Sequence, residues 1–327
     1  MRVLMIGRLE TWMKFHLELM VRGFEEAGSV VRLVDYHRMN RLFGRIKMPE
    51  AMQRKQFSRQ LRKIAESFRP DLIFFVAALK QDPLEIREYF KGRIVFYDYD
   101  GWKYLQSITP WLAHLDLLLT GESKVVEQVK EIQSRALYLP GAVDCGFFAP
   151  AELSPEEKRL YGAPISFVGR ATPRRIDFCG AVADLGLAVY GERWHRQEAC
   201  RNGGVLERSW RFDRDVSDAE AVKIYNASGC VINILRENSS MPSMQVYHVP
   251  ACGACLLTEY CDDLPETFEI GKEILAFSSP EELREQAEMV LREPEKARRI
   301  GAAARKRCIG QYTFRHRAER ILRALEG

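Results

Sequence analysis

The first 140 residues alternate short apolar runs with segments of helical periodicity. The apolar runs lie at 3–6, 30–34, 72–77, 94–97, 115–119 and 136–139. Segment 12–26 places Trp12, Phe15, Leu19 and Phe24 near one helix face, and 83–90 and 122–133 also suit helices. Near-continuous apolar strands separated by helices indicate a parallel sheet buried on both faces. The pattern therefore predicts a Rossmann-like α/β domain for the first part of the chain.

Residues 229–261 carry the clearest crossover unit in the sequence. An apolar run from Cys230 to Leu235 stops in a polar loop, and a short helical segment follows from Pro242 to about Cys252. A glycine-marked turn then leads to a second apolar run at 254–257. This order predicts strand, loop, helix, turn and strand. The loop residues Asn238, Ser239 and Ser240 enter a helix N-terminus, whose backbone N–H groups and dipole favour an anion such as a diphosphate.

A second anion-ready loop follows the apolar strand ISFV at 165–168. The strand runs into Gly169 and then into Arg170, Thr172, Arg174 and Arg175. Glycine permits close backbone approach to a ligand, and guanidinium groups pair with phosphate in fixed geometry. Two such loops at strand ends of one domain predict a pyrophosphate site, against the alternative that the arginines begin an exposed helix.

The length and the remaining pattern predict two domains. The chain has 327 residues, which is long for one core. A Pro/Gly-rich segment, YLPGAVDCGFFAP at 138–150, separates two alternating halves. The tail predicts a strand at 274–277, helices after Pro280 and Pro294, and a last helix near 313–325. We expect domains at 1–145 and 146–311, with 312–327 as a final helix.

Composition and charge indicate an ordinary globular protein. The chain is 46% hydrophobic and 29% charged, with a net charge of +4 that gives no argument for nucleic acid. No apolar run approaches the ~20 residues that span a bilayer. The N-terminus MRVLMIGR begins a strand and lacks a cleavable signal pattern, so we expect a cytoplasmic location.

The segment 38–69 is strongly basic. It contains ten Lys or Arg against only Glu50 and Glu66, interleaved with apolar residues such as Met52 and Phe57. Such a segment can lie on an anionic membrane, here the inner membrane face. The alternative is a solvated helix whose apolar side packs on the sheet.

Eight cysteines are scattered through the chain, which favours reduced thiols. His248, Cys252, Cys255 and Cys261 could be drawn as a zinc site, but a lone CxxC beside a glycine turn is more often packing. We therefore expect no metal. Gly7 follows the first strand without a GxGxxG pattern, which removes the main support for a nicotinamide cofactor. We expect no cofactor besides the substrate nucleotide.

An acidic pair, Asp98 and Asp100, follows the fourth apolar run. In a parallel sheet the carboxyl end of a strand faces the ligand crevice, so either carboxylate could act as a base or orient an acceptor hydroxyl. The alternative role for Asp100 is to cap the helix that begins near Trp102.

Several of these segments resemble one family. VINI at 231–234 with QVYHVPACGACLLTEY at 245–260, the segment at 138–150, and LAVYGERW at 187–194 resemble the donor half of GT-B glycosyltransferases. The likeness is to the group 1 (family 4) enzymes, in particular the spore maturation protein CgeB-like branch. It covers most of the chain, more closely after residue 138. Gln245 stands where the family tends to have Arg, and His248 where it tends to have Glu.

The resemblance implies a GT-B fold with two Rossmann-like domains facing a central cleft and a last helix that crosses back to the first domain. It implies a hexosyltransferase-type enzyme (EC class 2.4) of polysaccharide biosynthesis that transfers a sugar from a nucleotide donor to a glycan, lipid-linked or protein acceptor. It favours retention at the anomeric carbon and needs no metal for the diphosphate. It places Gly169, Gly191 and the 238–240 loop at the donor, Tyr247 and His248 at the ribose, and Asp100 or Asp98 at the acceptor.

Two alternatives remain open from the residues. One is another nucleotide-sugar enzyme on the same scaffold, such as an epimerase. The other is a non-catalytic binding or scaffold protein, because the residues at 245 and 248 depart from the family pattern.

Overall fold

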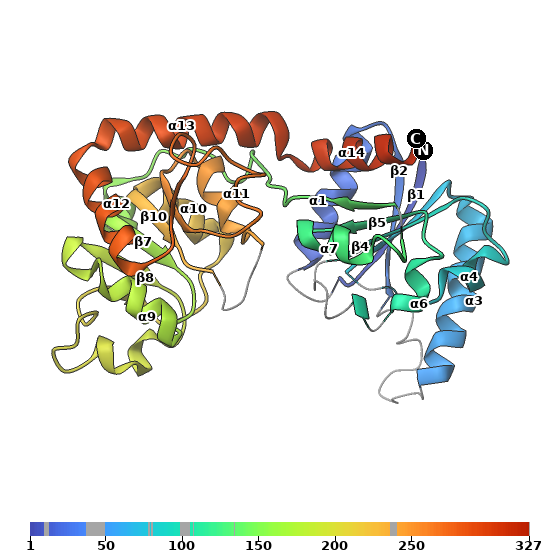
Figure 1. Cartoon of the computed structure of the whole chain (residues 1–327), viewed down its shortest axis with the longest axis horizontal. Coiled ribbons are helices and arrows are strands. Elements are labelled where there is room, and N and C mark those ends of the chain that lie inside the picture. Colours follow the sequence, from blue (N-terminus) through green and yellow to red (C-terminus); the bar gives the residue numbers. More distant parts are fainter. Residues whose placement is uncertain are drawn as a thin grey trace. The chain divides into compact units, whose positions relative to one another are not determined.

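The chain divides into two compact units in the computed structural model (Figure 1). The first unit is Met1–Pro140 together with Phe314–Gly327, and the second is Gly141–Thr313. The structure describes residues 1–9, 13–36, 50–77, 79, 81–98, 105–106, 108–133, 135–235 and 241–326. Asp100, Asn238, Ser239 and Ser240, all predicted site residues, lie outside this set, as does the start of the basic segment up to residue 49.

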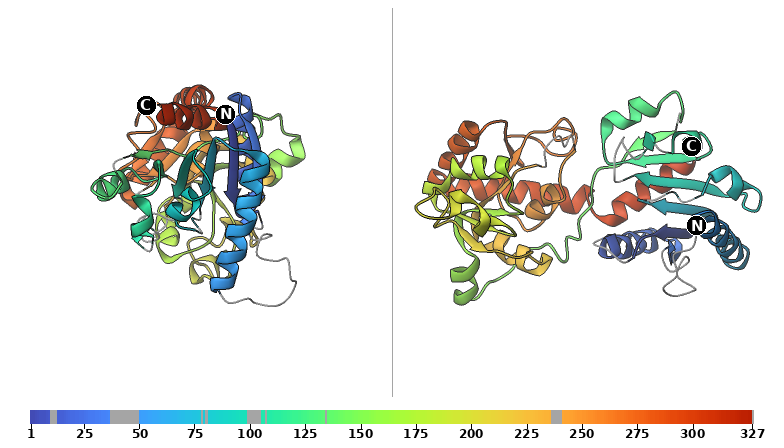
Figure 2. Two further views of the ribbon diagram at one scale, coloured as in Figure 1. Left: turned by 90° about the vertical axis from the view of Figure 1, so that its right-hand side faces the viewer. Right: turned by 90° about the horizontal axis from the view of Figure 1, so that it is seen from below.

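The first unit contains a six-stranded parallel sheet in the order β2-β1-β3-β4-β5-β6 (Figure 2). The strands are β1 (Arg2–Gly7), β2 (Val30–Asp35), β3 (Leu72–Val76), β4 (Arg93–Asp98), β5 (Leu117–Thr120) and β6 (Ala136–Tyr138). β3 is buried along its whole length, as expected for a strand covered on both faces. The predicted Rossmann-like sheet is therefore confirmed.

Helices cover both faces of this sheet. They are α1 (Met13–Glu26), α3 (Glu50–Phe68), α4 (Pro83–Arg87), α6 (Thr109–Leu112), α7 (Ser123–Val129) and α14 (Phe314–Glu326). One core cluster joins Ile73 and Phe75 of β3 to residues of α3, α4, α6 and α7. The alternate residue Phe74 packs on Phe24 of α1, with ring centroids 5.7 Å apart. This division follows from right-handed crossovers that run in opposite directions from β1 and β3.

The last helix, α14, packs against α1 of the same unit. A Cβ at Gly23 of α1 would lie 2.5 Å from the carbonyl oxygen of Phe314, so glycine permits the close approach. His16 of α1 meets the Phe314 ring edge-on at 5.0 Å, and Arg135 donates a hydrogen bond of 2.5 Å to the Ala324 carbonyl. The prediction that the final helix returns to the first half of the chain is confirmed.

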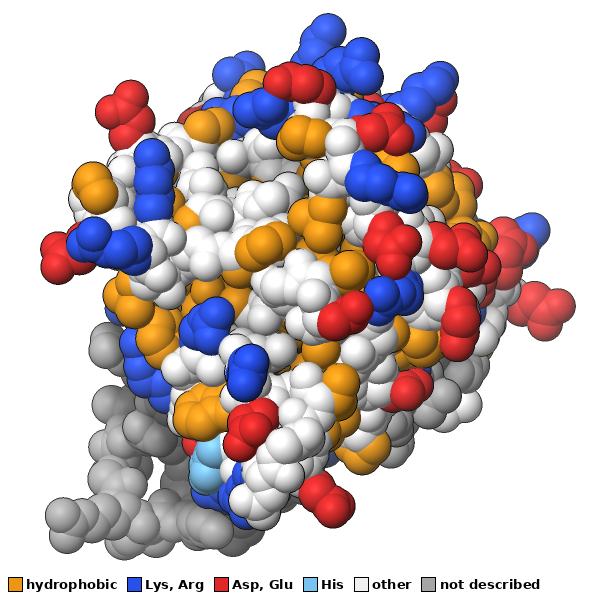
Figure 3. Space-filling model, turned by 90° about the vertical axis from the view of Figure 1, so that its left-hand side faces the viewer, with side chains coloured by type: hydrophobic (Ala, Val, Ile, Leu, Met, Phe, Trp, Pro, Cys, Tyr) orange, Lys and Arg blue, Asp and Glu red, His pale blue; other side chains and the backbone are white. Residues whose placement is uncertain are grey.

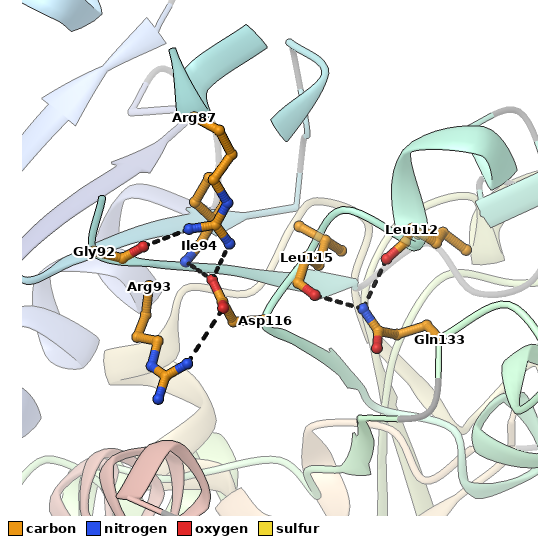
Figure 4. A network of polar contacts seen from close by, with 8 residues as sticks. All are labelled: Arg87, Gly92, Arg93, Ile94, Leu112, Leu115, Asp116 and Gln133. Atoms are coloured by element: carbon orange, nitrogen blue, oxygen red, sulfur yellow. Dashed lines mark hydrogen bonds and ion pairs between the residues drawn. The ribbon is translucent and has the colours of Figure 1, made fainter. Parts of the chain in front are cut away.

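A polar network ties the loops at the amino ends of β4 and β5 (Figure 4). Asp116 accepts a hydrogen bond of 2.6 Å from the Ile94 backbone N–H, contacts Arg87, and lies 3.5 Å from Arg93. Gln133 donates to the carbonyls of Leu112 and Leu115 at 2.7 and 2.8 Å. These bonds satisfy backbone groups where the chain enters the sheet.

The second unit has its own six-stranded parallel sheet, in the order β12-β11-β10-β7-β8-β9. The strands are β7 (Ala163–Val168), β8 (Leu187–Tyr190), β9 (Trp210–Phe212), β10 (Ser228–Asn233), β11 (Leu256–Glu259) and β12 (Leu275–Phe277). The chain proceeds outward from β7 in one direction and from β10 in the other. β7 and β10 therefore form the point where the strand order reverses.

Two core clusters fill the two faces of the second sheet. The helices are α8 (Pro155–Tyr161), α9 (Pro173–Gly180), α10 (Asp218–Ala227), α11 (Gln245–Ala251), α12 (Pro280–Arg292) and α13 (Pro294–Gln311), with short 3₁₀ turns η1 (Ala183–Leu185), η2 (Trp194–Arg196) and η3 (Glu198–Cys200). One cluster contains buried residues of α10 and α11, the other contains residues of α9 and α12, and α13 contributes to both. Ser217 caps α10: its hydroxyl accepts a hydrogen bond from the Glu220 backbone N–H, and the Glu220 carboxylate accepts one from the Ser217 backbone N–H.

The last strand of the predicted crossover unit begins later than expected. The apolar run predicts a strand at 254–257, whereas β11 spans Leu256–Glu259. Gly253 adopts a left-handed φ of +79°, and Ala254 donates back to the Val249 carbonyl, so the turn extends over these residues. A Cβ at Gly301 of α13 would lie 2.2 Å from the Gly253 carbonyl oxygen, which shows how closely α13 covers the turn.

The surface of the second unit seen in Figure 3 carries Lys and Arg interspersed with Asp and Glu. Arg284 and Asp184 form one partly exposed ion pair of the second unit, with nitrogen and oxygen 2.7 Å apart. Within the part of the chain that the structure describes, every helix is too short or too polar to cross a bilayer.

Candidate functional site

The candidate site lies at the carboxyl edge of the second sheet, where β7 and β10 meet. In open parallel sheets ligands bind outside the carboxyl ends of the strands at the point where the strand order reverses. β7 ends at Val168 and is followed by Gly169, while β10 ends at Asn233 and is followed by Ile234 and Leu235. Both anion-ready loops of the sequence leave the sheet at this point.

The loop after β7 brings the start of α9 to the edge. Thr172 is the N-cap residue of α9, and its hydroxyl accepts a hydrogen bond of 3.3 Å from the Arg175 backbone N–H. Gly169 donates to the Tyr190 carbonyl at 2.8 Å and so stays close to β8. Helix N-terminal N–H groups and the dipole make this edge favourable for an anion.

Arg170 and Arg174 both reach carboxylates at this edge. Arg170 is about half exposed and lies 3.0 Å from Glu192 in the loop after β8. Arg174 forms a two-pronged pair with Glu259 at the end of β11, with one bond of 2.9 Å. Glu259 is buried and also accepts a 3.0 Å hydrogen bond from the Leu235 N–H. The pair therefore links the start of α9 to the ends of β10 and β11.

Arg175 binds backbone carbonyls. Its guanidinium donates to the Arg170 carbonyl at 3.0 Å and to the Ile234 carbonyl at 3.1 Å. It also lies 5.5 Å from the centroid of the Phe167 ring. Arg175 thus holds the loops after β7 and β10 together while keeping its positive charge at the edge.

Gly191 lets the loop after β8 pass close to the loop after β7. Its φ is +138°, and a Cβ there would lie 2.3 Å from the Gly169 carbonyl oxygen. Trp194 donates its indole N–H to the same carbonyl at 2.8 Å, and Ala171 donates to the Glu192 carbonyl at 3.0 Å. The loops after β7 and β8 are therefore joined by two hydrogen bonds and a close backbone approach.

The helix α11 carries Gln245, Tyr247 and His248. Gln245 donates a 2.7 Å hydrogen bond to the Val168 carbonyl, which brings the start of α11 to the end of β7. Tyr247 is buried, and its ring packs on Phe268 and Tyr312. His248 is partly buried and stacks on Phe148 with ring centroids 3.8 Å apart. The predicted contact of Tyr247 and His248 with a ribose stays a prediction.

The edge also contains polar residues that the sequence reasoning did not single out. Asn233 donates to the Thr258 hydroxyl at 2.9 Å and accepts from Ser243 at 3.0 Å. Glu259 is the partner of Arg174 described above. The signal for both was a polar residue ending an otherwise apolar strand, in VIN and in LLTE. At the other side of the edge, His195 of η2 contacts Asp213 after β9.

In the first unit, Asp98 is the last residue of β4 and is 1% exposed. Thr120 at the end of β5 is its neighbour across the strand pair. Glu122, in the turn after β5, is also buried. Asp98 therefore lies at the carboxyl edge of its sheet, where its position after the apolar run predicts it.

The four residues of the drawn zinc site do not converge. Cys252 and Cys261 belong to the core cluster on one face of the second sheet, and Cys255 belongs to the cluster on the other. Burial raises the pKa of each of these thiols to about 12. The described residues contain no group of three or more His, Cys, Asp or Glu that could hold a metal ion. These cysteines are core residues.

A hollow of about 380 Å³ opens at the opposite, amino edge of the second sheet. It is lined by the starts of β10 and β11 and by the junction of α12 and α13. Its lining residues Asn226 and Ser228 form hydrogen bonds with the surrounding protein.

Residues 174–323 match the family described as "Glycosyl transferase-like". No curated protein matches the chain. The fold is shared with a glycosyltransferase from Rickettsia africae (TM-score 0.71, 13% identity, covering 99% of this chain and 97% of that one). It is also shared with Anabaena Alr3699/HepE in complex with UDP (0.70, 11%, 100% of each chain). A third similar structure, from Listeria monocytogenes, is assigned as a UDP-N-acetylglucosamine 2-epimerase (0.62, 13%, 99% and 95%). The chain has the GT-B fold, as predicted.

Proposed function

We propose that this chain is a group 1-like GT-B glycosyltransferase that transfers a sugar from a nucleotide-diphosphate donor to an acceptor. The observation that carries the proposal is the arginine-bearing carboxyl edge of the second sheet. Arg174, Arg175 and the ends of β10 and β11 lie within residues 174–323, the part that matches the glycosyl transferase-like family. Arg170, Arg174 and Arg175 follow β7, one of the two strands at the point where the strand order reverses, and Arg175 also contacts the chain after β10, the other strand. The complex of Alr3699/HepE with UDP favours a uridine donor for this fold.

The proposed chemistry is stabilisation of the leaving diphosphate. As the bond from the sugar to the diphosphate breaks, negative charge grows on the phosphate oxygens. Arginine side chains and helix N–H groups held beside this position stabilise that charge and lower the barrier, because they need little reorganisation during the reaction. We assign the reaction as hexosyl transfer with retention at the anomeric carbon. We propose that the donor is bound by Gly169, Arg170, Thr172, Arg174, Arg175, Gly191, Asn238, Ser239, Ser240, Tyr247 and His248.

We assign the acceptor side to Asp98 or Asp100. A carboxylate at the end of β4 can orient an acceptor hydroxyl or take its proton. The acceptor class we propose is a glycan, a lipid-linked sugar or a protein. The D98N variant should bind UDP like the unchanged protein and lose transfer, whereas equal transfer by both would remove Asp98 from the site.

The direct test of the donor site is calorimetric titration with UDP, GDP, TDP and CDP. The R170A variant should bind the preferred nucleotide more weakly by about 1.5–3 kcal/mol, the range for hydrogen bonds to charged groups. Arg170 is the cleaner choice because Arg174 also supports the fold through Glu259. The matched control is R208A, which removes the same charge just before β9, at the other edge of the sheet. Equal affinities for R170A and the unchanged protein would refute the donor site.

Activity separates this proposal from its alternatives. Transfer of sugar from UDP-glucose or another donor to an acceptor supports the glycosyltransferase. Epimerisation of the donor sugar without an acceptor supports an epimerase, the activity to which the similar Listeria monocytogenes structure is assigned. Nucleotide binding without turnover of any donor supports the scaffold protein.

We also propose that the basic helix α3 contacts an anionic membrane surface. Its side chains Arg54, Lys55, Arg59 and Lys63 are exposed, and Met52 is 57% exposed beside them. Its opposite face, with Phe57 and Leu61, is buried in the sheet. Cationic and apolar side chains on one face suit an interface. Vesicle co-sedimentation should rise with the anionic lipid fraction and fall in R59E/K63E; binding independent of lipid charge would exclude this contact.

A further inference from the structure

The hollow at the amino edge of the second sheet has the size of a small-molecule site. Its volume of about 380 Å³ falls within the range of roughly 300–1,000 Å³ that such sites occupy. Strands β10 and β11 begin beside the hollow and end at the candidate donor site, so the two lie at opposite edges of the sheet. A ligand in the hollow would therefore not compete directly with the diphosphate.

Most of the side chains that line the hollow are apolar or small. The polar residues Asn226 and Ser228 already use their side chains in hydrogen bonds to the protein. The body of a ligand would therefore meet mainly apolar groups. These come from the end of α12, the start of α13 and the turn before β11, and they are Cys252, Cys255, Val290, Leu291, Pro294 and Ala297.

Arg298 gives the hollow a positive charge. The described residues that line the hollow include no Asp, Glu or Lys. The partner of Arg298 is Glu295, one turn earlier in α13, and the two side chains are 69% and 79% exposed. Ion pairs as exposed as this contribute little, so Arg298 can exchange Glu295 for an anion in the hollow at small cost. A guanidinium can bind a carboxylate with two parallel hydrogen bonds.

The hollow is connected to the donor edge through α10 and α11. Tyr225, near the end of α10, lines the hollow. Burial raises the pKa of the Tyr225 hydroxyl, and a hydrogen bond from the Gln245 side chain acts against this shift. Gln245 also donates to the Val168 carbonyl at the end of β7, at 2.7 Å. Cys252, which lines the hollow, directly follows α11, and Gln245 is the first residue of that helix.

On these grounds we propose that the hollow is a regulatory site for a small organic monocarboxylate with an apolar body. The carboxylate pairs with Arg298, and the body lies against the apolar lining. A ligand that contacts the ends of α10 and α11 orders both helices, so nucleotide binding at the other end of α11 costs less ordering. The acid should then raise UDP affinity, and UDP should raise the affinity for the acid by the same factor. This regulatory effect rests on the proposed donor site, whereas the binding of the acid does not.

The first test is titration of 3-phenylpropionate into the full chain, beside the uncharged 3-phenylpropanol. The acid should bind with a Kd near or below about 1 mM. R298Q should bind the acid about tenfold more weakly and the alcohol as before, because only the acid pairs with the guanidinium. The matched control R299Q removes the next arginine, which is exposed and outside the lining, and should change neither affinity. A254L, which fills the hollow from the turn before β11, should abolish both, and thermal melting confirms that each variant is folded.

The second test repeats the UDP titration with the hollow saturated by 3-phenylpropionate. UDP affinity should rise about fivefold. Y225F removes the hydroxyl that bonds to Gln245, so it should bind the acid and lose most of this gain.

The outcomes separate the two parts of the proposal. Equal binding of the acid by the unchanged protein, R298Q and A254L overturns the site, as does the lack of binding at about 10 mM. Binding of the acid without a change in UDP affinity overturns the regulatory role. Failure to bind UDP in either condition refutes the donor site, and the first titration still decides whether the hollow binds the acid.

Discussion

The buried pair of Glu259 and Arg174 gives the sharpest test of the second unit, because one substitution should change stability and nucleotide binding in opposite directions. Glu259 holds the Arg174 guanidinium with both oxygens and also accepts from the Leu235 N–H. Its side chain is 8% exposed and that of Arg174 is 32% exposed. We change Glu259 to Ala or to Gln.

The magnitude follows from the contacts. Removing one partner of a buried ion pair costs about 3–5 kcal/mol, and the partial exposure of Arg174 moves this toward the lower end. E259A also leaves the Leu235 N–H without its acceptor. We expect a loss of about 3 kcal/mol for E259A, and of about 1–2 kcal/mol for E259Q, which keeps a neutral acceptor of the same shape. Urea unfolding measures both values, and a cycle with R174M should give a coupling near 2 kcal/mol.

Nucleotide binding should respond with the other sign. Glu259 offsets the charge of Arg174, so E259Q leaves an uncompensated cation at the edge. UDP affinity should rise several-fold in E259Q, measured by calorimetry at a temperature where the variant is folded. A loss of stability below about 0.5 kcal/mol would place the pair among solvent-screened surface contacts and refute the reasoning.

Three further predictions concern stability. Burial lowers the pKa of His16 to about 4 from an ordinary 6.5, so the folded state favours the neutral ring and stability is lost as the pH falls from 6.5 toward 4. The free energy of unfolding should fall by about 2 kcal/mol between pH 7 and pH 5. The H16Q variant should lose most of this pH dependence, measured by urea unfolding at the two pH values. An unchanged pH dependence in H16Q would assign the effect elsewhere. Gly191→Ala should lower the melting temperature of the protein clearly more than Gly271→Ala does. Both glycines have a positive φ, but of the two only Gly191 would place a Cβ within 4 Å of a backbone oxygen. Equal melting temperatures for the two variants would contradict the close approach at Gly191. Asp116→Ala should lower the free energy of unfolding by about 2 kcal/mol, because it removes the bonds to the Ile94 N–H and to the arginines. Glu127→Ala, which removes one partner of an exposed pair, should change it by no more than about 0.5 kcal/mol. Similar unfolding midpoints for the two variants would argue against the network.

The two parallel sheets could be predicted because strands buried on both faces are short, continuous runs of apolar residues. β3 (LIFFV) is apolar at every position, and β4 (RIVFYD) is apolar between its first and last residues, without an alternation of polar and apolar positions. Strand ends are less certain, because they depend on what covers them. β11 begins two residues late since α13 closes on the Gly253 turn from 48 positions further along the chain.

The strand ends that carry the candidate site could be predicted from the sequence, but the contacts of their side chains could not. Glycine and arginine after ISFV mark a strand end, which is local information. The partner of Arg174 is 85 residues away, and no periodicity shows that a buried Glu259 will take its guanidinium. The contact of His195 with Asp213 joins loops after two different strands, and neither residue belongs to a recognisable motif.

The cysteines of this protein supply a built-in probe of local opening. Cys179, Cys230 and Cys255 are buried in one core cluster of the second unit, while Cys252 and Cys308 are buried in the other. Thiolates are the reactive form, and burial keeps these groups protonated, so a thiol reagent reaches them only when the surrounding segment unfolds. The rate at which each cysteine is alkylated under native conditions therefore reports the opening of its own side of the sheet, without any label being introduced.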